Sequence, residues 1–164
     1  PYRLLGWSLG GALAHAVAAR LQADGEEVEL LALLDAAPID PAHRPGLHTA
    51  DPAVVERLVR EALGSHAADA AHVGAVTRVL ERYEALLPTY RHSLYKGPAH
   101  YFRATVPDPA HRAAGGPQEW EPYLTAPPTV HDIPCTHSTM GTASAMARIG
   151  RLLHPLLARE HQHQ

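Results

Sequence analysis

The chain contains little cysteine, almost no net charge and no long apolar run. Cys135 is the single cysteine among 164 residues, so no disulfide forms within the chain and a reducing, cytoplasmic location is expected. The formal net charge of −3 gives no electrostatic reason to expect nucleic acid or an anionic membrane as a partner. A membrane-spanning helix needs about 18 or more apolar residues in a row, and no charged leader opens the chain. We therefore expect neither nucleic acid nor membrane as a partner.

Histidine is plentiful, with 13 residues, but its placement does not favour a metal centre. Most of the histidines are scattered or fall in predicted loops, and His161 and His163 belong to a polar C-terminal tail. A zinc site needs several converging ligands supported by second-shell contacts. Because no close group of His, Cys and acidic residues occurs, we predict no metal.

The first forty residues form one strand–helix–strand unit. The short apolar run Tyr2–Leu5 predicts a strand, and the Ala- and Leu-rich segment Ala12–Ala23 predicts a helix that Gly25 ends. The nearly continuous apolar stretch Val28–Leu34 is typical of a strand that is covered on both faces. This order predicts a βαβ crossover in a mostly parallel sheet.

The turn inside this unit carries the pattern of a nucleophilic serine. Residues 6–10 read Gly-Trp-Ser-Leu-Gly, and in Gly-x-Ser-x-Gly the serine occupies a strained turn where the glycines remove clashing side chains. The backbone N–H of the next residue, Leu9, then faces the developing oxyanion at a helix N-terminus. The alternative is a glycine-rich turn with an incidental serine. The strand before it and the helix after it favour Ser8 as the nucleophile.

A serine hydroxyl needs a base and an acid that orients the base, and both are found further along the chain. Asp35 ends the strand after the nucleophile helix. His137 lies in a loop between a predicted last strand, Thr129–Ile133, and a helix that starts near residues 141–143. The order serine, acid, histidine is that of the α/β-hydrolase fold. All three side chains are expected at the carboxyl edge of the sheet.

Each assignment has a competitor. Asp108 follows a predicted strand at His100–Thr105 and is a second possible acid at the same edge, whereas Asp35 could instead be a cap or turn residue. His131 is the main rival base, but it falls inside a strand. His137 itself could be an ordinary exposed loop histidine.

The middle and the end of the chain are predicted to be helical. Residues 49–96 contain two segments of helical spacing, which form either a lid over the carboxyl edge or an ordinary crossover layer. Trp120–Tyr123 predicts a short helix near His137 with its aromatic rings in the core. The last helix is expected to bury one stripe and to be kinked or loosened by Pro155; the stripe comprises Ala143, Met146, Ile149, Leu153 and Leu156.

Three segments, residues 2–14, 27–35 and 133–140, resemble the C-terminal thioesterase domain of nonribosomal peptide synthetases, in the α/β-hydrolase superfamily. The resemblance covers almost the whole chain and implies one thioesterase domain over 1–164. It matches Ser8 to the acylated serine, Asp35 to the acid and His137 to the late histidine. Trp7, before the serine, favours the peptide-synthetase type.

The resemblance also implies a fold, a mechanism and partners. The fold is an α/β-hydrolase with helices on both faces of a mostly parallel sheet, here without the family's N-terminal strands and their second oxyanion N–H. In the implied reaction of nonribosomal peptide (antibiotic) biosynthesis, Ser8 takes a peptidyl or acyl chain from the phosphopantetheine of a carrier domain. Water, or an amine or hydroxyl of the same chain, then releases it as acid or macrocycle.

No cofactor is expected on the domain itself, since the phosphopantetheine belongs to the partner carrier domain. Three alternatives remain open: a stand-alone editing thioesterase, another serine ester hydrolase, or a non-catalytic fragment that keeps the three residues.

Overall fold

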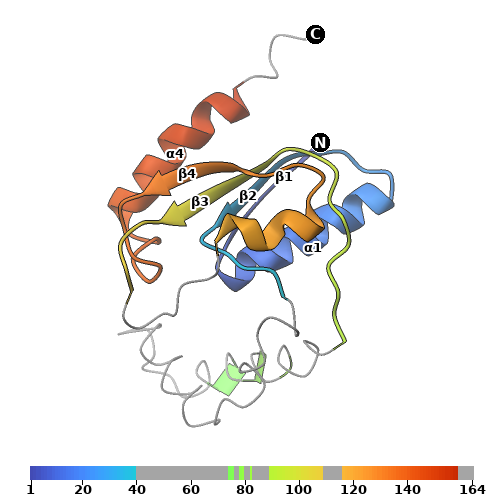
Figure 1. Ribbon diagram of the computed structural model, residues 1–164, viewed down its shortest axis with the longest axis horizontal. Coiled ribbons are helices and arrows are strands. Elements are labelled where there is room, and N and C mark those ends of the chain that lie inside the picture. The colour runs from blue at the N-terminus through green and yellow to red at the C-terminus, as the bar shows by residue number, and fades with distance from the viewer. Residues whose placement is uncertain (40–73, 76–77, 80–81, 83–88, 109–115, 159–164) are drawn as a thin grey trace. The chain divides into compact units, whose positions relative to one another are not determined.

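The computed structural model describes residues 1–39, 74–75, 78–79, 82, 89–108 and 116–158 (Figure 1). The chain divides into two compact units, residues 1–38 with 92–164, and residues 39–91. The strands of the described residues and every predicted site residue belong to the first unit. The predicted lid over residues 49–96 lies for the most part outside the described residues.

Four parallel strands form the described sheet, in the spatial order β1-β2-β3-β4. Their bounds are β1 Tyr2–Trp7, β2 Val28–Leu34, β3 Ala99–Ala104 and β4 Thr129–Ile133. The predictions for β2 and β4 are confirmed residue for residue, while β1 runs two residues beyond its prediction. Because all neighbouring strands are parallel, their carboxyl ends meet at one edge of the sheet.

Helices cover both faces of this sheet, as Figure 1 shows for α1 (Leu9–Ala23) and α4 (Ala143–Leu157). Six of the seven residues of β2 are buried. Leu30, Ala32 and Leu34 share a core cluster with residues of α4. Because side chains alternate along a strand, the fully buried Leu31 and Leu33 point to the opposite face. The nearly continuous apolar run of β2 therefore reflects burial on both faces.

The helix α4 departs from its predicted buried stripe. Met146 is 38% exposed and Ala143 is also exposed, so their predicted burial is wrong. The predicted burial of Ile149 and Leu153 is confirmed, and Ala145, which the predicted stripe left out, is buried with them. These three residues recur at i, i+4, i+8 and so lie on one side of the helix. The helix continues to Leu157, two residues past Pro155.

A short 3-10 helix, η3 (Pro117–Tyr123), follows β3. Its second half is the predicted short helix Trp120–Tyr123. Trp120 is fully buried, as expected for a core residue. Its indole Nε1–H donates a 2.8 Å hydrogen bond to the carbonyl of Ala36. A buried tryptophan thus holds the backbone of the residue that follows Asp35.

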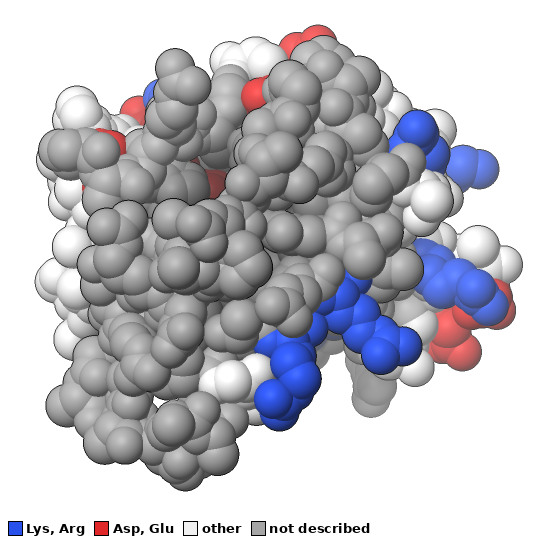
Figure 2. Space-filling model, turned by 90° about the horizontal axis from the view of Figure 1, so that it is seen from below, with Lys and Arg blue, Asp and Glu red and all other residues white. Residues whose placement is uncertain are grey.

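Exposed charges pair locally and contribute little to the fold. Arg3 and Arg103 each make two hydrogen bonds to a carboxylate on the neighbouring strand, that of Glu29 and that of Asp132. Ion pairs at the surface contribute little to stability, because water and salt screen them. On the face in Figure 2, described Lys and Arg side chains lie at the lower centre and along the right side, where some of them lie beside acidic residues. None of the helices in the described part of the chain is long and apolar enough to cross a membrane.

Candidate active site

Ser8 occupies a single-residue turn between β1, which ends at Trp7, and α1, which starts at Leu9. Its φ of 54° and ψ of −124° are unusual for a residue with a side chain. Such backbone strain costs about 1–3 kcal/mol and persists where the surroundings enforce it. Here the Ser8 N–H donates to the carbonyl of Leu34 at 3.0 Å. The turn therefore fixes the serine at the carboxyl edge of the sheet.

Two of the three glycines around Ser8 are required by close packing. A Cβ atom on Gly6 would lie 2.0 Å from the carbonyl oxygen of Gly10, and one on Gly11 would lie 2.3 Å from the Cβ of Ala36. A Cβ on Gly10 would meet nothing within 4 Å. The expectation that both motif glycines remove clashing side chains is right for Gly6 and wrong for Gly10. What approaches Gly6 is the backbone of Gly10 at the start of α1.

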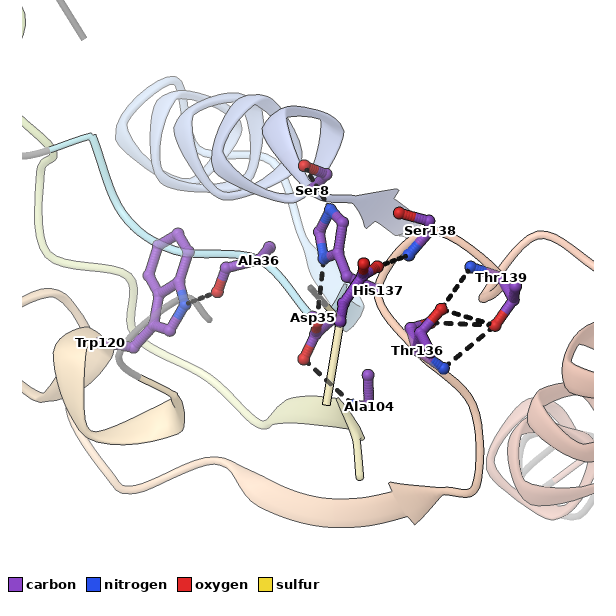
Figure 3. A network of polar contacts seen from close by, with 10 residues as sticks. Ser8, Asp35, Ala36, Ala104, Trp120, Thr136, His137, Ser138 and Thr139 are labelled. Atoms are coloured by element: carbon purple, nitrogen blue, oxygen red, sulfur yellow. Dashed lines mark hydrogen bonds and ion pairs between the residues drawn. The ribbon is translucent and has the colours of Figure 1, made fainter. Parts of the chain in front are cut away.

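The structure brings together the three residues predicted to act on the substrate (Figure 3). His137 Nε2 lies 3.1 Å from Ser8 Oγ, and His137 Nδ1 lies 2.9 Å from Asp35 Oδ2. His137 is 8% exposed. Because an ionised carboxylate only accepts hydrogen bonds, Nδ1 carries a proton, and in the neutral imidazole the lone pair of Nε2 then faces the serine hydroxyl. This is the arrangement in which an imidazole removes a proton from a hydroxyl.

Asp35 is fixed by contacts with β3 as well as with the histidine. Its N–H donates to the carbonyl of Phe102 at 2.8 Å, and its Oδ1 accepts the N–H of Ala104 at 3.0 Å (Figure 3). Its backbone has a φ of 44°, a conformation that asparagine and aspartate adopt more readily than most residues. The carboxylate thus joins β3 to His137 and does not act as a cap of its own turn.

The histidine is presented by a loop between β4 and α4 that is rich in hydroxyl contacts. The hydroxyls of Thr136 and Thr139 lie 2.9 Å apart, and the carbonyl of His137 accepts the N–H of the fully buried Met140 at 3.3 Å. Asp108, the competing acid, lies at this same edge. Its Oδ2 accepts the backbone N–H of Ser138 at 2.8 Å. Asp35 therefore contacts the imidazole, and Asp108 contacts the backbone beside it.

His131, the rival base, lies within β4 and pairs with a histidine of β3. Its Nε2 is 3.0 Å from Nδ1 of His100, and its ring stacks on Phe102 with centroids 4.8 Å apart. Burial lowers the pKa of both histidines. His131 thus packs on the face of the sheet, as expected for a strand residue.

Leu9, the predicted oxyanion donor, is the first residue of α1. The first N–H groups of a helix have no acceptor within the helix and lie at its positive end. The N–H of Leu9 is therefore suited to stabilise negative charge beside Ser8. The ring of Trp7 lies 5.6 Å from that of His137, centroid to centroid, and its side chain is 42% exposed.

A second histidine cluster was not predicted from the sequence. His15 of α1 is fully buried, with Nδ1 3.0 Å from Nδ1 of His92 and Nε2 3.0 Å from the carbonyl of Tyr123. Its ring also packs against Trp120, with centroids 4.9 Å apart. Burial lowers the pKa of His15. The one sequence feature that indicates burial of His15 is its place among small residues on an Ala-rich helix. Within the described residues, no three His, Cys, Asp or Glu side chains are grouped to hold a metal ion.

A parallel sheet with a serine on a strained strand-to-helix turn, followed in the chain by an acid and a histidine, defines the α/β-hydrolase class. The model of the Thioesterase domain family matches residues 1–157. The chain therefore belongs to the thioesterase domain family, as the resemblance implied.

Its curated relatives are large synthetases. The chain is 33% identical over 174 residues to malpibaldin synthetase of Mortierella alpina, which aligns 97% of the chain with 3% of the relative. It is 32% identical over 168 residues to vanchrobactin synthetase VabF of Vibrio anguillarum, covering 96% of the chain and 6% of the relative. The chain thus spans only a few per cent of the length of these proteins.

Solved thioesterase domains share the fold. The NocB thioesterase domain, in covalent complex with a fluorophosphonate nocardicin G analog, is 26% identical with a TM-score of 0.65, covering 96% of this chain and 67% of that one. A four-domain nonribosomal peptide synthetase gives a TM-score of 0.75 at 16% identity, covering 96% of this chain and 14% of that one. These matches confirm the predicted α/β-hydrolase fold.

Proposed function

We propose that this chain is a chain-releasing serine thioesterase of nonribosomal peptide biosynthesis, which frees a peptidyl or acyl chain from a carrier domain. The observation that carries the proposal is the hydrogen-bonded series Ser8–His137–Asp35. It occurs in a member of the thioesterase domain family whose relatives include a dimodular nonribosomal peptide synthase of Bacillus subtilis.

In the first step, Ser8 Oγ attacks the carbonyl carbon of the thioester that joins the acyl chain to the phosphopantetheine thiol of the carrier domain. His137 Nε2 removes the hydroxyl proton as the bond forms. The resulting oxyanion is stabilised by the N–H of Leu9. When the C–S bond breaks, His137 returns the proton to the departing thiolate, which leaves the acyl chain as an ester on Ser8.

In the second step Ser8 Oγ is the leaving group instead of the nucleophile. Water, or an amine or hydroxyl of the same acyl chain, attacks the Ser8 ester while His137 Nε2 takes its proton, and the proton then passes to Ser8 Oγ. Attack by water yields a carboxylic acid, and attack by the chain's own nucleophile yields a macrocycle. Support for a covalent step comes from the NocB domain, which forms a covalent complex with a fluorophosphonate.

Asp35 performs two tasks in both steps. Its carboxylate keeps the proton of neutral His137 on Nδ1, and it stabilises the imidazolium that forms. Because Oδ1 is held by the N–H of Ala104, Oδ2 is directed at the imidazole. No cofactor takes part, since the phosphopantetheine enters with the substrate on the partner carrier domain.

Turnover of a thioester tests this function. The intact protein is mixed with an acyl-pantetheine thioester, and free thiol and the acyl-enzyme are followed together. We expect both to form, and Ser8→Ala to abolish both. Ser144→Ala, which removes an exposed hydroxyl from α4, is the matched control and should behave like the wild type.

Two outcomes would contradict the proposal. One is a wild type that is folded and produces neither thiol nor adduct, which favours the non-catalytic reading. The other is thiol release that persists in Ser8→Ala, which requires a different nucleophile. The same acyl chain presented on a carrier domain should be released faster than on free pantetheine; equal rates would favour a general ester hydrolase.

A further inference from the structure

The segment that leaves β3, residues 104–108, contacts both the acid and the loop of the base. We propose that Asp108 is a positioning residue, which holds His137 at Ser8 through the backbone of Ser138. This inference rests on the proposed function, because it concerns the geometry of the same reaction.

Three hydrogen bonds join this segment to the site. The N–H of Ala104 donates to Asp35 Oδ1 at 3.0 Å, and the N–H of Val106 donates to the carbonyl of Cys135 at 3.1 Å. The third is the 2.8 Å bond from the N–H of Ser138 to Asp108 Oδ2. Ala104 and Ser138 are both visible beside the site in Figure 3. One exit segment therefore sets where the acid and the base lie relative to each other.

The contacts within the histidine loop cannot do this alone. Thr136 and Thr139 are hydrogen-bonded to each other through hydroxyl and backbone groups, which fixes the shape of the loop. Both residues move with the loop, so their contacts do not fix its distance from Ser8. Asp108 belongs to a different strand exit and anchors the residue directly after His137 to the sheet.

The chemistry of this contact suits an anchor. A carboxylate that accepts a backbone N–H forms a charge-assisted bond, which is shorter and stronger than a neutral one. Asp108 is half-buried, whereas Ser138 is exposed, so the bond lies at the surface of the site. Loss of the anchor would let the His137 backbone drift, and a misplacement of about 1 Å can cost as much as ~10²-fold in rate.

The test compares Asp108→Ala with Asp108→Asn in the intact protein. Asparagine keeps an oxygen that accepts the Ser138 N–H and loses the charge, whereas alanine loses both. With a saturating acyl-pantetheine thioester, we expect Asp108→Ala to lower kcat about 10-fold with little change in KM. Asp108→Asn should retain kcat within about 3-fold, with an unmoved pH profile. Asp132→Ala and Asp132→Asn, which remove an exposed carboxylate of β4, are matched controls and should match the wild type.

A second readout does not depend on activity. Hydrogen exchange of the Ser138 amide should be faster in Asp108→Ala than in the wild type or in Asp108→Asn. The proposal is wrong if Asp108→Ala keeps wild-type kcat, even with a lower melting temperature, since the role is then only structural. It is also wrong if Asp108→Asn falls as far as Asp108→Ala and its pH profile shifts, since charge is then what matters.

Failure of this inference is distinguishable from failure of the proposed function. A folded wild type that never acylates Ser8 contradicts the function itself. A wild type that acylates Ser8, together with an Asp108→Ala variant of equal rate and equal Ser138 exchange, contradicts only the role of Asp108. If Asp108→Ala does not fold, Asp108→Val, which also lacks an acceptor for the Ser138 N–H, takes its place in both readouts.

Discussion

Two buried histidines in this molecule have similar surroundings, but only one of them is placed to act as a base. His137 is 8% exposed and His15 is fully buried, and each uses both ring nitrogens in polar contacts. Each also lies beside a tryptophan ring, that of Trp7 or that of Trp120. Burial and hydrogen-bond count therefore do not separate a base from a structural residue.

The partners separate them. His137 lies between the carboxylate of Asp35 and the hydroxyl of Ser8, so a proton taken from the serine is stabilised by a negative charge. His15 lies between a carbonyl and the imidazole of His92, neither of which is anionic. The carbonyl only accepts, so His15 keeps its proton on Nε2 and accepts at Nδ1 from His92. His15 thus holds α1 to η3 as a neutral ring.

The largest expected effect comes from exchanging each histidine for glutamine. His137→Gln should lower the rate of Ser8 acylation by about 10⁴-fold or more, because the base is lost. His15→Gln should leave the rate of the folded protein within about 3-fold. Stopped-flow or quenched acylation, normalised to the folded fraction, measures both. Equal losses in the two variants would remove the distinction between them.

Asp35→Asn tests the partner that sets His137 apart. The amide no longer enforces the tautomer with the proton on Nδ1, so kcat should fall about 10³–10⁴-fold. Circular dichroism should show an unchanged fold, because the amide still offers an oxygen to the N–H of Ala104. Asp132→Asn is the control for loss of a carboxylate. A loss below 10-fold would mean that another acid orients the histidine.

The structural histidine should show its effect in stability. His15→Ala leaves a cavity and removes the hydrogen-bond partner of His92, so the free energy of unfolding should fall by about 2–4 kcal/mol. Denaturant titration measures this change. His154→Ala on α4, an exposed histidine, should change stability by less than about 0.5 kcal/mol. Similar values for the two variants would contradict a role for His15 in the core.

The smallest expected effect is a dependence of stability on pH. Burial lowers the pKa of His15 from its ordinary value of 6.5. Below pH 6.5 the His15 ring is therefore protonated to a greater extent in the unfolded chain than in the folded chain. The stability contributed by neutral His15 is therefore present above pH 6.5 and is lost as the pH falls below it. His100 and His131, whose pKa values are also lowered, act in the same direction.

Melting temperatures between pH 8 and pH 5 test this dependence. His15→Ala should flatten the acid side of the curve relative to His154→Ala. A curve that is equally steep in both variants would mean that other groups cause the loss of stability at low pH.

Much of this site follows from local sequence patterns, because its parts lie at the ends of strands. The apolar run of β2 ends at Asp35, and the carboxyl ends of parallel strands meet at one edge, so its approach to Ser8 and His137 could be predicted. The start of α1 could not, because the strained turn at Ser8 lets the helix begin at Leu9, three residues before its helix-favouring run.

Contacts between distant segments carried no local signal. His15 and His92 are 77 residues apart, and nothing near either one in the sequence indicates a partner. The place of Asp108 after a strand makes it a candidate triad acid. Its carboxylate in fact accepts the backbone N–H of Ser138, a contact that depends on side-chain geometry and not on sequence spacing. In α4, the larger apolar side chain of Met146 favours it over Ala145 as a buried residue. The face of the helix that packs on the sheet decides burial, however, and Ala145 lies on that face.

The most direct measurement is the site of covalent acylation in the intact protein. The protein is incubated with an acyl-pantetheine thioester, quenched in acid and digested, and the acylated peptide is identified by mass spectrometry. The adduct should lie on Ser8, should be absent in Ser8→Ala, and should accumulate far more slowly in His137→Gln than in His15→Gln. An adduct on another residue, or equal acylation of the two histidine variants, would contradict the assignment of Ser8 and His137.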